Sequence, residues 1–268
     1  MIVTTGGRTD STTVISARRI AEEIGGTFVE RRKQPLSVMK LKFGEQIVVL
    51  GRNRMECHFP HKEEPLFFHP NSAMFRVKRL LRNEKDPFAE ALGLMEGKTV
   101  LDCTMGLGSD SIVASYIVGN KGKVIGLEGD AMISYLVKTG LASYQSGLKQ
   151  LDESMKRIKV IHTDHLDYLK NCRTNEFDVI FFDPMFEEEI EEASNFSPLK
   201  SLALYSPLTK EAIHEAKRAA KEKVVLKDHW KSSRFEELGF RQIKRKSSKF
   251  HYGVIEMSEG AKTISGGG

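Results

Sequence analysis

The chain has few of the features that mark secreted, disulfide-rich or membrane proteins. It contains three cysteines in 268 residues. Cys57, Cys103 and Cys172 are too few and too widely spaced for a disulfide framework or a cysteine-rich metal site. No apolar run approaches the roughly 20 residues that cross a bilayer, and the N-terminus lacks a basic leader followed by an apolar core. We therefore expect a cytoplasmic protein with no membrane contact and no metal ion.

Positive charge is unevenly distributed in an otherwise average composition. The chain is 40% hydrophobic and 29% charged, which excludes global disorder. Residues 30–85 hold 13 lysines and arginines against 6 acidic residues, and residues 217–249 hold 12 against 4. The clearest acidic run is 187–192. Two basic segments suit a polyanionic partner, although two ordinary solvated faces fit the charge equally well.

Proline residues divide the chain near its first quarter. Pro60, Pro65 and Pro70 lie in a stretch that neither a helix nor a central strand tolerates. Four segments are predicted: a small N-terminal α/β subdomain, a basic linker with helices, a larger domain and a flexible tail, at 1–60, 61–96, 97–258 and 259–268. In the first, we expect strands at 2–4, 46–50 and 55–59 and a helix at 11–24.

After Gly97, short apolar runs alternate with helical patterns. Strands are predicted at 99–101, 123–127, 158–161, 179–182 and 223–226, with helical segments such as 130–144 between them. This alternation is typical of βαβ units on a parallel sheet buried on both faces. Residues 240–243 and 252–257 are joined by a connection too short for a helix. The predicted fold is therefore a Rossmann-like, mostly parallel α/β sheet with a C-terminal antiparallel hairpin, which distinguishes it from an ordinary NAD-binding sheet.

A glycine turn follows the first predicted strand of the larger domain. Gly106 and Gly108 let the backbone adopt positive φ and let a ligand approach closely. The helix that opens at Ser109 or Asp110 supplies free N–H groups. Ser111 replaces the third glycine of the dinucleotide fingerprint, which disfavours pyrophosphate binding. Taken alone, the two glycines also fit a plain tight turn.

Acidic residues follow the next two strands. Glu128 lies 20 residues beyond Gly108, where a carboxylate can accept hydrogen bonds from ribose hydroxyls. The alternative is a helix N-cap, a role that Asp130 fits better. Asp164 follows the third strand, which we expect to be buried, and can either accept from an adenine amine or cap a helix at Leu166.

Residues 177–186 combine an apolar strand with an acid, a proline and an aromatic ring. Asp183, Pro184 and Phe186 would lie at the carboxyl edge of the sheet, where open α/β sheets bind ligands. Pro184 stiffens the turn and removes a donor, which leaves an acceptor-rich surface. Such a surface suits an exocyclic amine, with Phe186 stacking on the base. The alternative is a structural Asp-Pro turn.

Residues 97–257 resemble the class I S-adenosylmethionine-dependent methyltransferases. More narrowly, they resemble the small-subunit rRNA methyltransferase J family, which methylates a guanine N2 in 16S rRNA. The matching motifs are Asp102-x-Thr104-x-Gly106-Leu107-Gly108-x-Asp110, Leu127-Glu128, Asp183-Pro184-Met185-Phe186 and Val224-Val225-Leu226-Lys227. Met185 is informative because most amine methyltransferases have a second proline there. Ser109 stands where that family usually has arginine, and the first 60 residues match only loosely.

The resemblance implies an S-adenosylmethionine cofactor and direct methyl transfer to an amine. The implied cofactor-binding residues are Asp102, Thr104, Gly106, Gly108, Ser109, Asp110, Glu128, Gly129, Asp164, His165 and Asp183. The implied catalytic residues are Asp183, Pro184 and Phe186. From charge and position, the expected RNA-binding residues are Arg76, Lys78, Arg79, Lys227, Lys244, Arg245 and Lys246.

Three functions remain open from the sequence. The first is an RNA guanine-N2 methyltransferase acting on ribosomal RNA of the small subunit. The second is a methyltransferase for a protein or a small molecule, and the third is a non-catalytic RNA-binding protein with this fold. Lys227 is equally open, because it can hold a phosphate or a base carbonyl, or simply extend to solvent from a strand end.

Overall fold

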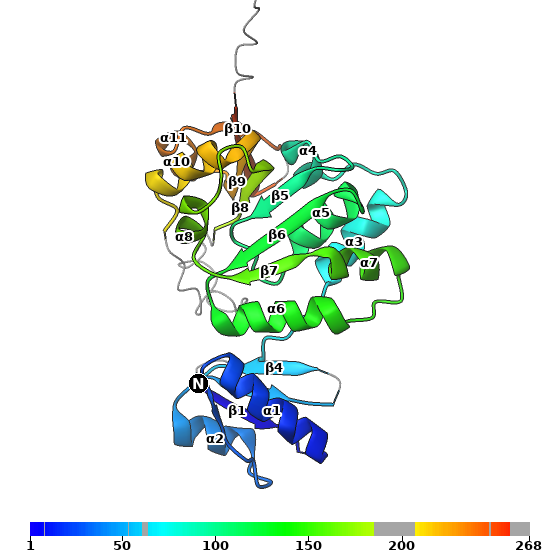
Figure 1. The fold of residues 1–268 in the computed structure, drawn as a ribbon, viewed down its shortest axis with the longest axis vertical. Coiled ribbons are helices and arrows are strands. Elements are labelled where there is room, and N and C mark those ends of the chain that lie inside the picture. Colours follow the sequence, from blue (N-terminus) through cyan, green and yellow to red (C-terminus); the bar gives the residue numbers. More distant parts are fainter. Residues whose placement is uncertain (8, 53, 61–63, 185–206, 247, 258–268) are drawn as a thin grey trace, which may run out of the picture.

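The structure, a computed structural model, describes residues 1–7, 9–52, 54–60, 64–184, 207–246 and 248–257. Two β-sheets organise it, a four-stranded sheet near the N-terminus and a seven-stranded sheet in the rest of the chain. Figure 1 shows the smaller unit below helix α6 (Ala131–Ser143) of the larger one. The two units therefore meet along that helix.

The smaller unit has the strand order β2-β1-β3-β4. Its elements are β1 (Ile2–Thr5), α1 (Ser11–Glu23), β2 (Thr27–Phe28), α2 (Leu36–Phe43), β3 (Ile47–Leu50) and β4 (Met55–His58). Strands β1 and β3 are parallel, whereas β3 and β4 form an antiparallel pair. Asp10 caps α1 by accepting a hydrogen bond from the Thr13 N–H at 2.8 Å. The predicted strands and helix are confirmed, while β2 and α2 were not predicted.

The larger unit has the strand order β10-β11-β9-β8-β5-β6-β7. Its strands are β5 (Thr99–Asp102), β6 (Lys123–Glu128), β7 (Lys159–His162), β8 (Phe177–Phe182), β9 (Ala220–His229), β10 (Arg241–Ile243) and β11 (Phe250–Glu256). Its other helices are α3 (Asn71–Leu80), α4 (Pro87–Leu92), α5 (Ser109–Val118), α7 (Lys149–Arg157), α8 (His165–Lys170), α10 (Lys210–Ala219) and α11 (Arg234–Glu237). Strands β5 to β9 are parallel, and β11 is antiparallel to β9 and β10. The predicted fold class is confirmed.

Alternate residues of the central strands enter two hydrophobic layers. Val179 and Phe181 of β8 pack toward α3 to α7, whereas Ile180 and Phe182 pack toward α8, α10 and α11. This alternation follows from the two-residue period of a strand and explains the apolar runs. The edge strand β7 is packed on both faces but less completely, because Val160 and Ile161 contact opposite layers and are each only half-buried.

A close contact fixes the linker to the larger unit. A Cβ atom added to Gly140 in α6 would lie 2.1 Å from Cγ of Phe68, so the ring packs directly on the helix backbone. The Tyr144 hydroxyl lies 2.9 Å from Nε2 of His69. One hydrophobic cluster runs from Val3 of the smaller unit through Phe68 to Leu136 of α6. The smaller unit is therefore held against the larger one by a shared core.

Candidate functional site

The turn between β5 and α5 has the backbone that its glycines predict. Gly106 has a φ of +52° and Gly108 a φ of +80°, both in the left-handed region that favours glycine. A Cβ atom at Gly108 would lie 2.9 Å from Cε of Met105, whereas one at Gly106 would meet nothing within 4 Å. The turn is therefore packed beneath Gly108 and open above Gly106, where a ligand can approach the backbone.

Glu128 ends β6 with its carboxylate fixed beside this turn. Its Oε2 accepts a hydrogen bond from the Gly106 N–H at 3.0 Å, and its Oε1 accepts one from the Asp130 N–H at 2.9 Å. A carboxylate has about four acceptor positions, so both oxygens can accept again. Burial raises the pKa of Glu128. Asp130 caps α6 through the Ile133 N–H, which confirms its predicted role and leaves Glu128 as an oriented acceptor.

Asp102 and Thr104 lie beneath the turn and hold it in place. Asp102 is buried and accepts hydrogen bonds from the Thr104 N–H at 3.2 Å and the Ser111 hydroxyl at 2.6 Å. Burial raises its pKa to about 7. The Thr104 hydroxyl accepts from the Asp183 N–H at 2.6 Å, which ties the ends of β5 and β8 together. Ser111, which replaces the third glycine, is thus the buried partner of Asp102, a role that the sequence did not indicate.

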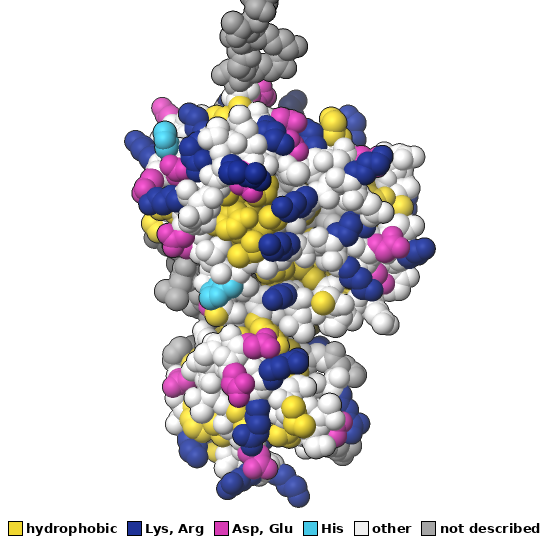
Figure 2. All heavy atoms as spheres, viewed as in Figure 1, with side chains coloured by type: hydrophobic (Ala, Val, Ile, Leu, Met, Phe, Trp, Pro, Cys, Tyr) yellow, Lys and Arg dark blue, Asp and Glu magenta, His cyan; other side chains and the backbone are white. Residues whose placement is uncertain are grey.

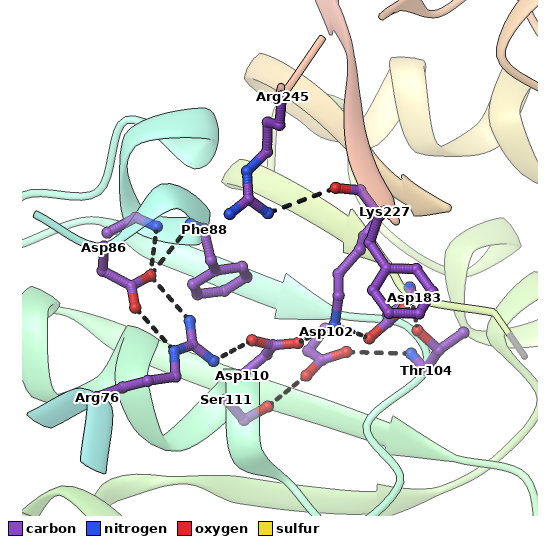
Figure 3. A network of polar contacts seen from close by, with 12 residues as sticks. Arg76, Asp86, Phe88, Asp102, Thr104, Asp110, Ser111, Asp183, Lys227 and Arg245 are labelled. Atoms are coloured by element: carbon purple, nitrogen blue, oxygen red, sulfur yellow. Dashed lines mark hydrogen bonds and ion pairs between the residues drawn. The ribbon is translucent and has the colours of Figure 1, made fainter. Parts of the chain in front are cut away.

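Five charged side chains of alternating sign connect Asp183 to the segment before α4 (Figure 3). Lys227 Nζ lies 2.5 Å from Oδ2 of Asp183 and 3.3 Å from Oδ2 of Asp110. Arg76 Nη1 lies 2.5 Å from Oδ1 of Asp110. On its other side, Arg76 binds Asp86 through Nε at 2.8 Å and Nη2 at 2.9 Å. Asp86 was missed by the sequence analysis, because the following proline signals only a helix start.

Negative charge exceeds positive charge in this cluster. The three carboxylates of Asp86, Asp110 and Asp183 accompany two cations, Arg76 and Lys227. Burial alone would raise the pKa of Asp110, but Lys227 and Arg76 outweigh it and hold that pKa below its usual value. Burial, with repulsion from Asp110, raises the pKa of Asp183 to about 6 despite Lys227. The excess of carboxylates favours a cationic ligand.

The predicted RNA-contacting residues divide into an exposed and an enclosed group. The exposed group is Lys78, Arg79, Lys244 and Lys246. The structure does not place Arg76 on that surface, because both sides of its guanidinium bind carboxylates. Lys227 likewise points inward to Asp110 and Asp183 and does not extend to solvent. Arg245 is half-buried, with its guanidinium carbon 5.7 Å from the centre of the Tyr252 ring.

Two predicted cofactor residues present polar atoms without a protein partner. Among the described residues, Oγ of Ser109 and Nε2 of His165 are buried and make no hydrogen bond. Burial lowers the pKa of His165, which favours its neutral form. Asp164 instead caps α8, accepting from the N–H groups of Leu166 at 2.8 Å and Asp167 at 3.3 Å. Asp164 therefore caps α8, as one of its two predicted roles, and its role toward an adenine amine stays a prediction.

Two further predicted residues, Gly129 and Pro184, follow the ends of strands β6 and β8. The Gly129 carbonyl lies 3.1 Å from Nε2 of His162, beside Glu128. Pro184 is buried directly after Asp183. Phe186, together with Met185 and the acidic run 187–192, lies outside the described residues. The stacking role of Phe186 stays a prediction.

None of the helices in the described ranges is long and apolar enough to cross a membrane. Within those same ranges, no three or more His, Cys, Asp or Glu side chains form a group that could hold a metal ion.

A family model of SAM-dependent methyltransferases, SAM_MT, matches residues 38–252. The chain belongs to this family. Its cofactor is S-adenosylmethionine. This methyltransferase is also 44% identical over 257 residues to the protein YpiP of Bacillus subtilis (strain 168), an alignment that covers 96% of this chain and 100% of YpiP.

Two proteins called Ribosomal RNA small subunit methyltransferase J match part of the methyltransferase. The one from Hydrogenovibrio crunogenus is 29% identical over 118 residues, which cover 43% of this chain and 41% of that protein. The one from Buchnera aphidicola is 31% identical over 148 residues, which cover 52% and 56%. A crystal structure of the SAM-dependent methyltransferase NGO1261 from Neisseria gonorrhoeae shares the fold, with a TM-score of 0.63, 14% identity and coverage of 98% and 99%.

The residues at the carboxyl edge of the sheet fit the family's cofactor. The buried hydroxyl of Ser109 has no partner among the described residues, and Glu128 keeps two acceptor positions. Gly106 leaves its backbone open to a ligand. The surplus of carboxylates around Asp183 complements the positive sulfonium and ammonium groups of S-adenosylmethionine.

Proposed function

We propose that this methyltransferase modifies the exocyclic N2 of a guanine in ribosomal RNA of the small subunit. The observation that carries the proposal is the position of Asp183 at the end of β8. Lys227 binds its Oδ2, and within the described residues Oδ1 accepts no hydrogen bond. An oriented carboxylate oxygen at this edge suits an amine that must be held and must lose a proton. The partial matches to two rRNA methyltransferases J support the same substrate class.

Asp183 and Lys227 provide the hydrogen bonding that the amine needs in order to react. When bound, S-adenosylmethionine supplies a methyl group that is already activated for displacement. A guanine amine is a poor nucleophile because its lone pair is delocalised into the ring. Asp183 accepts a hydrogen bond from that amine and favours its pyramidal form, in which the lone pair is available. Lys227 fixes the carboxylate through the opposite oxygen and so defines the direction of approach.

The exposed basic side chains favour a polyanionic substrate. Figure 2 shows lysine and arginine side chains along both units on one face of the molecule. Lys78 and Arg79 of α3, with Lys244 and Lys246 after β10, add exposed positive charge near the two ends of the charged cluster. Phosphate contacts of this kind supply affinity with little sequence information. A target guanine within a duplex would be flipped out before reaching Asp183.

The proposal is tested by offering tritiated S-adenosylmethionine with three acceptors. These are small ribosomal subunits from a strain without its own guanine-N2 methylation, free 16S rRNA from that strain, and its extracted ribosomal proteins. We expect label in the RNA, and a loss of about 100-fold or more for Asp183→Asn. Asp178→Asn is the matched control, because Asp178 lies at the opposite end of β8 and binds Thr99 and Lys221. Label in the proteins alone would contradict the proposal.

A further inference from the structure

Trp230 is an exposed aromatic side chain at the catalytic edge of the sheet. It is the one tryptophan of the chain, and 48% of its surface is exposed. It follows the last residue of β9, the strand that carries Lys227. Three residues of extended strand span about 10 Å. The backbone of Trp230 therefore lies about 10 Å from that of Lys227, whose side chain binds Asp183, and a nucleotide beside the target can span this distance.

The backbone around Trp230 is fixed on both sides. Its N–H donates to the Lys249 carbonyl at 2.9 Å, and its own carbonyl accepts from Nε2 of Gln242 at 2.8 Å. The preceding residue, His229, pairs with Phe250 of β11. The backbone that carries the ring is thus held at the end of a paired strand, so the ring has a defined point of attachment.

The charges around Trp230 are basic. Lys231 Nζ lies 5.1 Å from the centre of the indole ring. Lys249, whose carbonyl accepts from the Trp230 N–H, is exposed, as are Lys244 and Lys246 of the same connection between β10 and β11. Asp228, the acidic residue nearest in sequence, is buried and bound to Arg234. Interfaces between proteins also use exposed tryptophan, but they are depleted in lysine. An aromatic platform bordered by lysines therefore favours nucleic acid.

We propose that Trp230 stacks on an RNA base that neighbours the methylated nucleotide, while Lys231, Lys244, Lys246 and Lys249 bind the adjoining phosphates. This inference rests on the proposed RNA substrate. A nucleotide flipped into the site leaves its neighbours unstacked, and an exposed indole replaces the lost stacking at any sequence. Trp230 then binds the RNA beside the target nucleotide and is separate from the residues that hold the methyl donor.

The single tryptophan makes the test direct. Tryptophan emission is recorded with S-adenosylhomocysteine present at saturation, while a single-stranded RNA of about 12 nucleotides is added. We expect quenching that saturates with the binding curve from anisotropy of the same RNA carrying fluorescein. Trp230→Ala should weaken RNA binding about 5- to 100-fold, and Trp230→Phe should retain most of it. Leu41→Ala, which removes another exposed apolar side chain in α2, should bind normally.

The outcomes separate this inference from the proposed function. If the wild-type chain methylates and binds RNA but Trp230→Ala binds as tightly, the stacking platform is wrong and the proposed function stands. If neither methyl transfer to RNA nor RNA binding occurs in the wild type, both are wrong. A Trp230→Ala variant that loses methyl transfer to a protein acceptor, with no RNA effect, would assign the surface to a protein partner and overturn the inference. Unchanged affinity for S-adenosylmethionine is expected throughout.

Discussion

Lys227 forms ion pairs with two carboxylates, Asp183 directly after β8 and Asp110 in the first turn of α5. Arg76 binds Asp110 from the other side. The pKa values of the two carboxyl groups shift in opposite directions, because Asp110 lies beside two cations whereas Asp183 shares Lys227 with Asp110. The pKa of Asp110 is lowered for that reason, and burial raises the pKa of Asp183 to about 6.

The raised pKa of Asp183 predicts a pH dependence. The ionised carboxylate is the stronger acceptor and, unlike the protonated form, can take the proton that the amine loses, so activity should fall as the pH drops through about 6. We expect kcat/KM for S-adenosylmethionine, measured at constant RNA from about pH 5 to pH 8, to show an acidic limb near that value. Asp178→Asn should keep the limb. A rate that stays constant down to about pH 5 would contradict the role of Asp183.

Glu128 is predicted to carry a large share of cofactor affinity. Glu128→Ala removes an oriented acceptor and leaves the N–H groups of Gly106 and Asp130 without their partner. The loss should be about 1–3 kcal/mol in the binding free energy of S-adenosylmethionine, measured by titration calorimetry. Glu153→Ala, on the exposed side of α7, is the control. Affinity that is the same in both variants would contradict the assignment.

Helix α3 contacts the charged cluster through the side chain of Arg76. Arg76 connects Asp86, which caps α4, with Asp110 in the first turn of α5. The helix pair that precedes the sheet is therefore coupled electrostatically to the carboxyl edge of the sheet. Arg79 lies three residues further along the same helix, but its pair with Glu84 is exposed.

Arg76 and Arg79 should therefore differ sharply on substitution. Arg76→Ala leaves the buried Asp86 without its cation and Asp110 with Lys227 alone, and should lower the free energy of unfolding by about 3–5 kcal/mol. Arg79→Ala breaks a solvent-exposed pair and should cost less than about 1 kcal/mol. Guanidinium unfolding curves compare the two variants. Similar small losses would show that the charged cluster contributes little to the fold.

The sequence predicted elements that have strong local signals. Strands β5 and β6 are short apolar runs that end in Asp102 and Glu128, β8 is an apolar run followed by Asp183, and α6 follows its capping residue Asp130. Strand β2 has two residues and α2 has no side-chain cap, so neither gives such a signal.

Long-range pairing could not be predicted. The cluster joins residues 76, 110, 183 and 227, and nothing in the neighbourhood of each residue indicates its partner. For that reason Arg76 and Lys227 were predicted to bind RNA, although the structure turns both inward. Asp164 shows the same limit, since both a cap and a ligand acceptor fit its sequence and only the fold shows that it caps α8.

The two units together present the surface that we expect RNA to cross. Their shared core, from Val3 to Leu136 through Phe68, fixes the smaller unit beside α6. Exposed basic residues lie on α3, before the sheet, and after β10, in its final hairpin. A polyanion bound to both would cover the charged cluster between them.

This arrangement predicts a salt-dependent RNA affinity. Reversing Lys244 and Lys246 to glutamate should weaken binding and flatten the slope of log K against log salt by about one to two units, since each phosphate contact contributes about 0.7 to 0.9. The matched control reverses Lys121 and Lys149, which are equally exposed but lie on other segments. Filter binding at several salt concentrations measures both. An unchanged slope would mean that the hairpin lysines form only a solvated face.

The central claim is tested most directly by identifying the modified nucleoside. Small subunits labelled in the presence of the enzyme are digested to nucleosides, and the labelled product is compared by liquid chromatography and mass spectrometry with methylated standards. We predict that the label elutes as N2-methylguanosine and disappears with Asp183→Asn. Label in another nucleoside, or in protein, would contradict it.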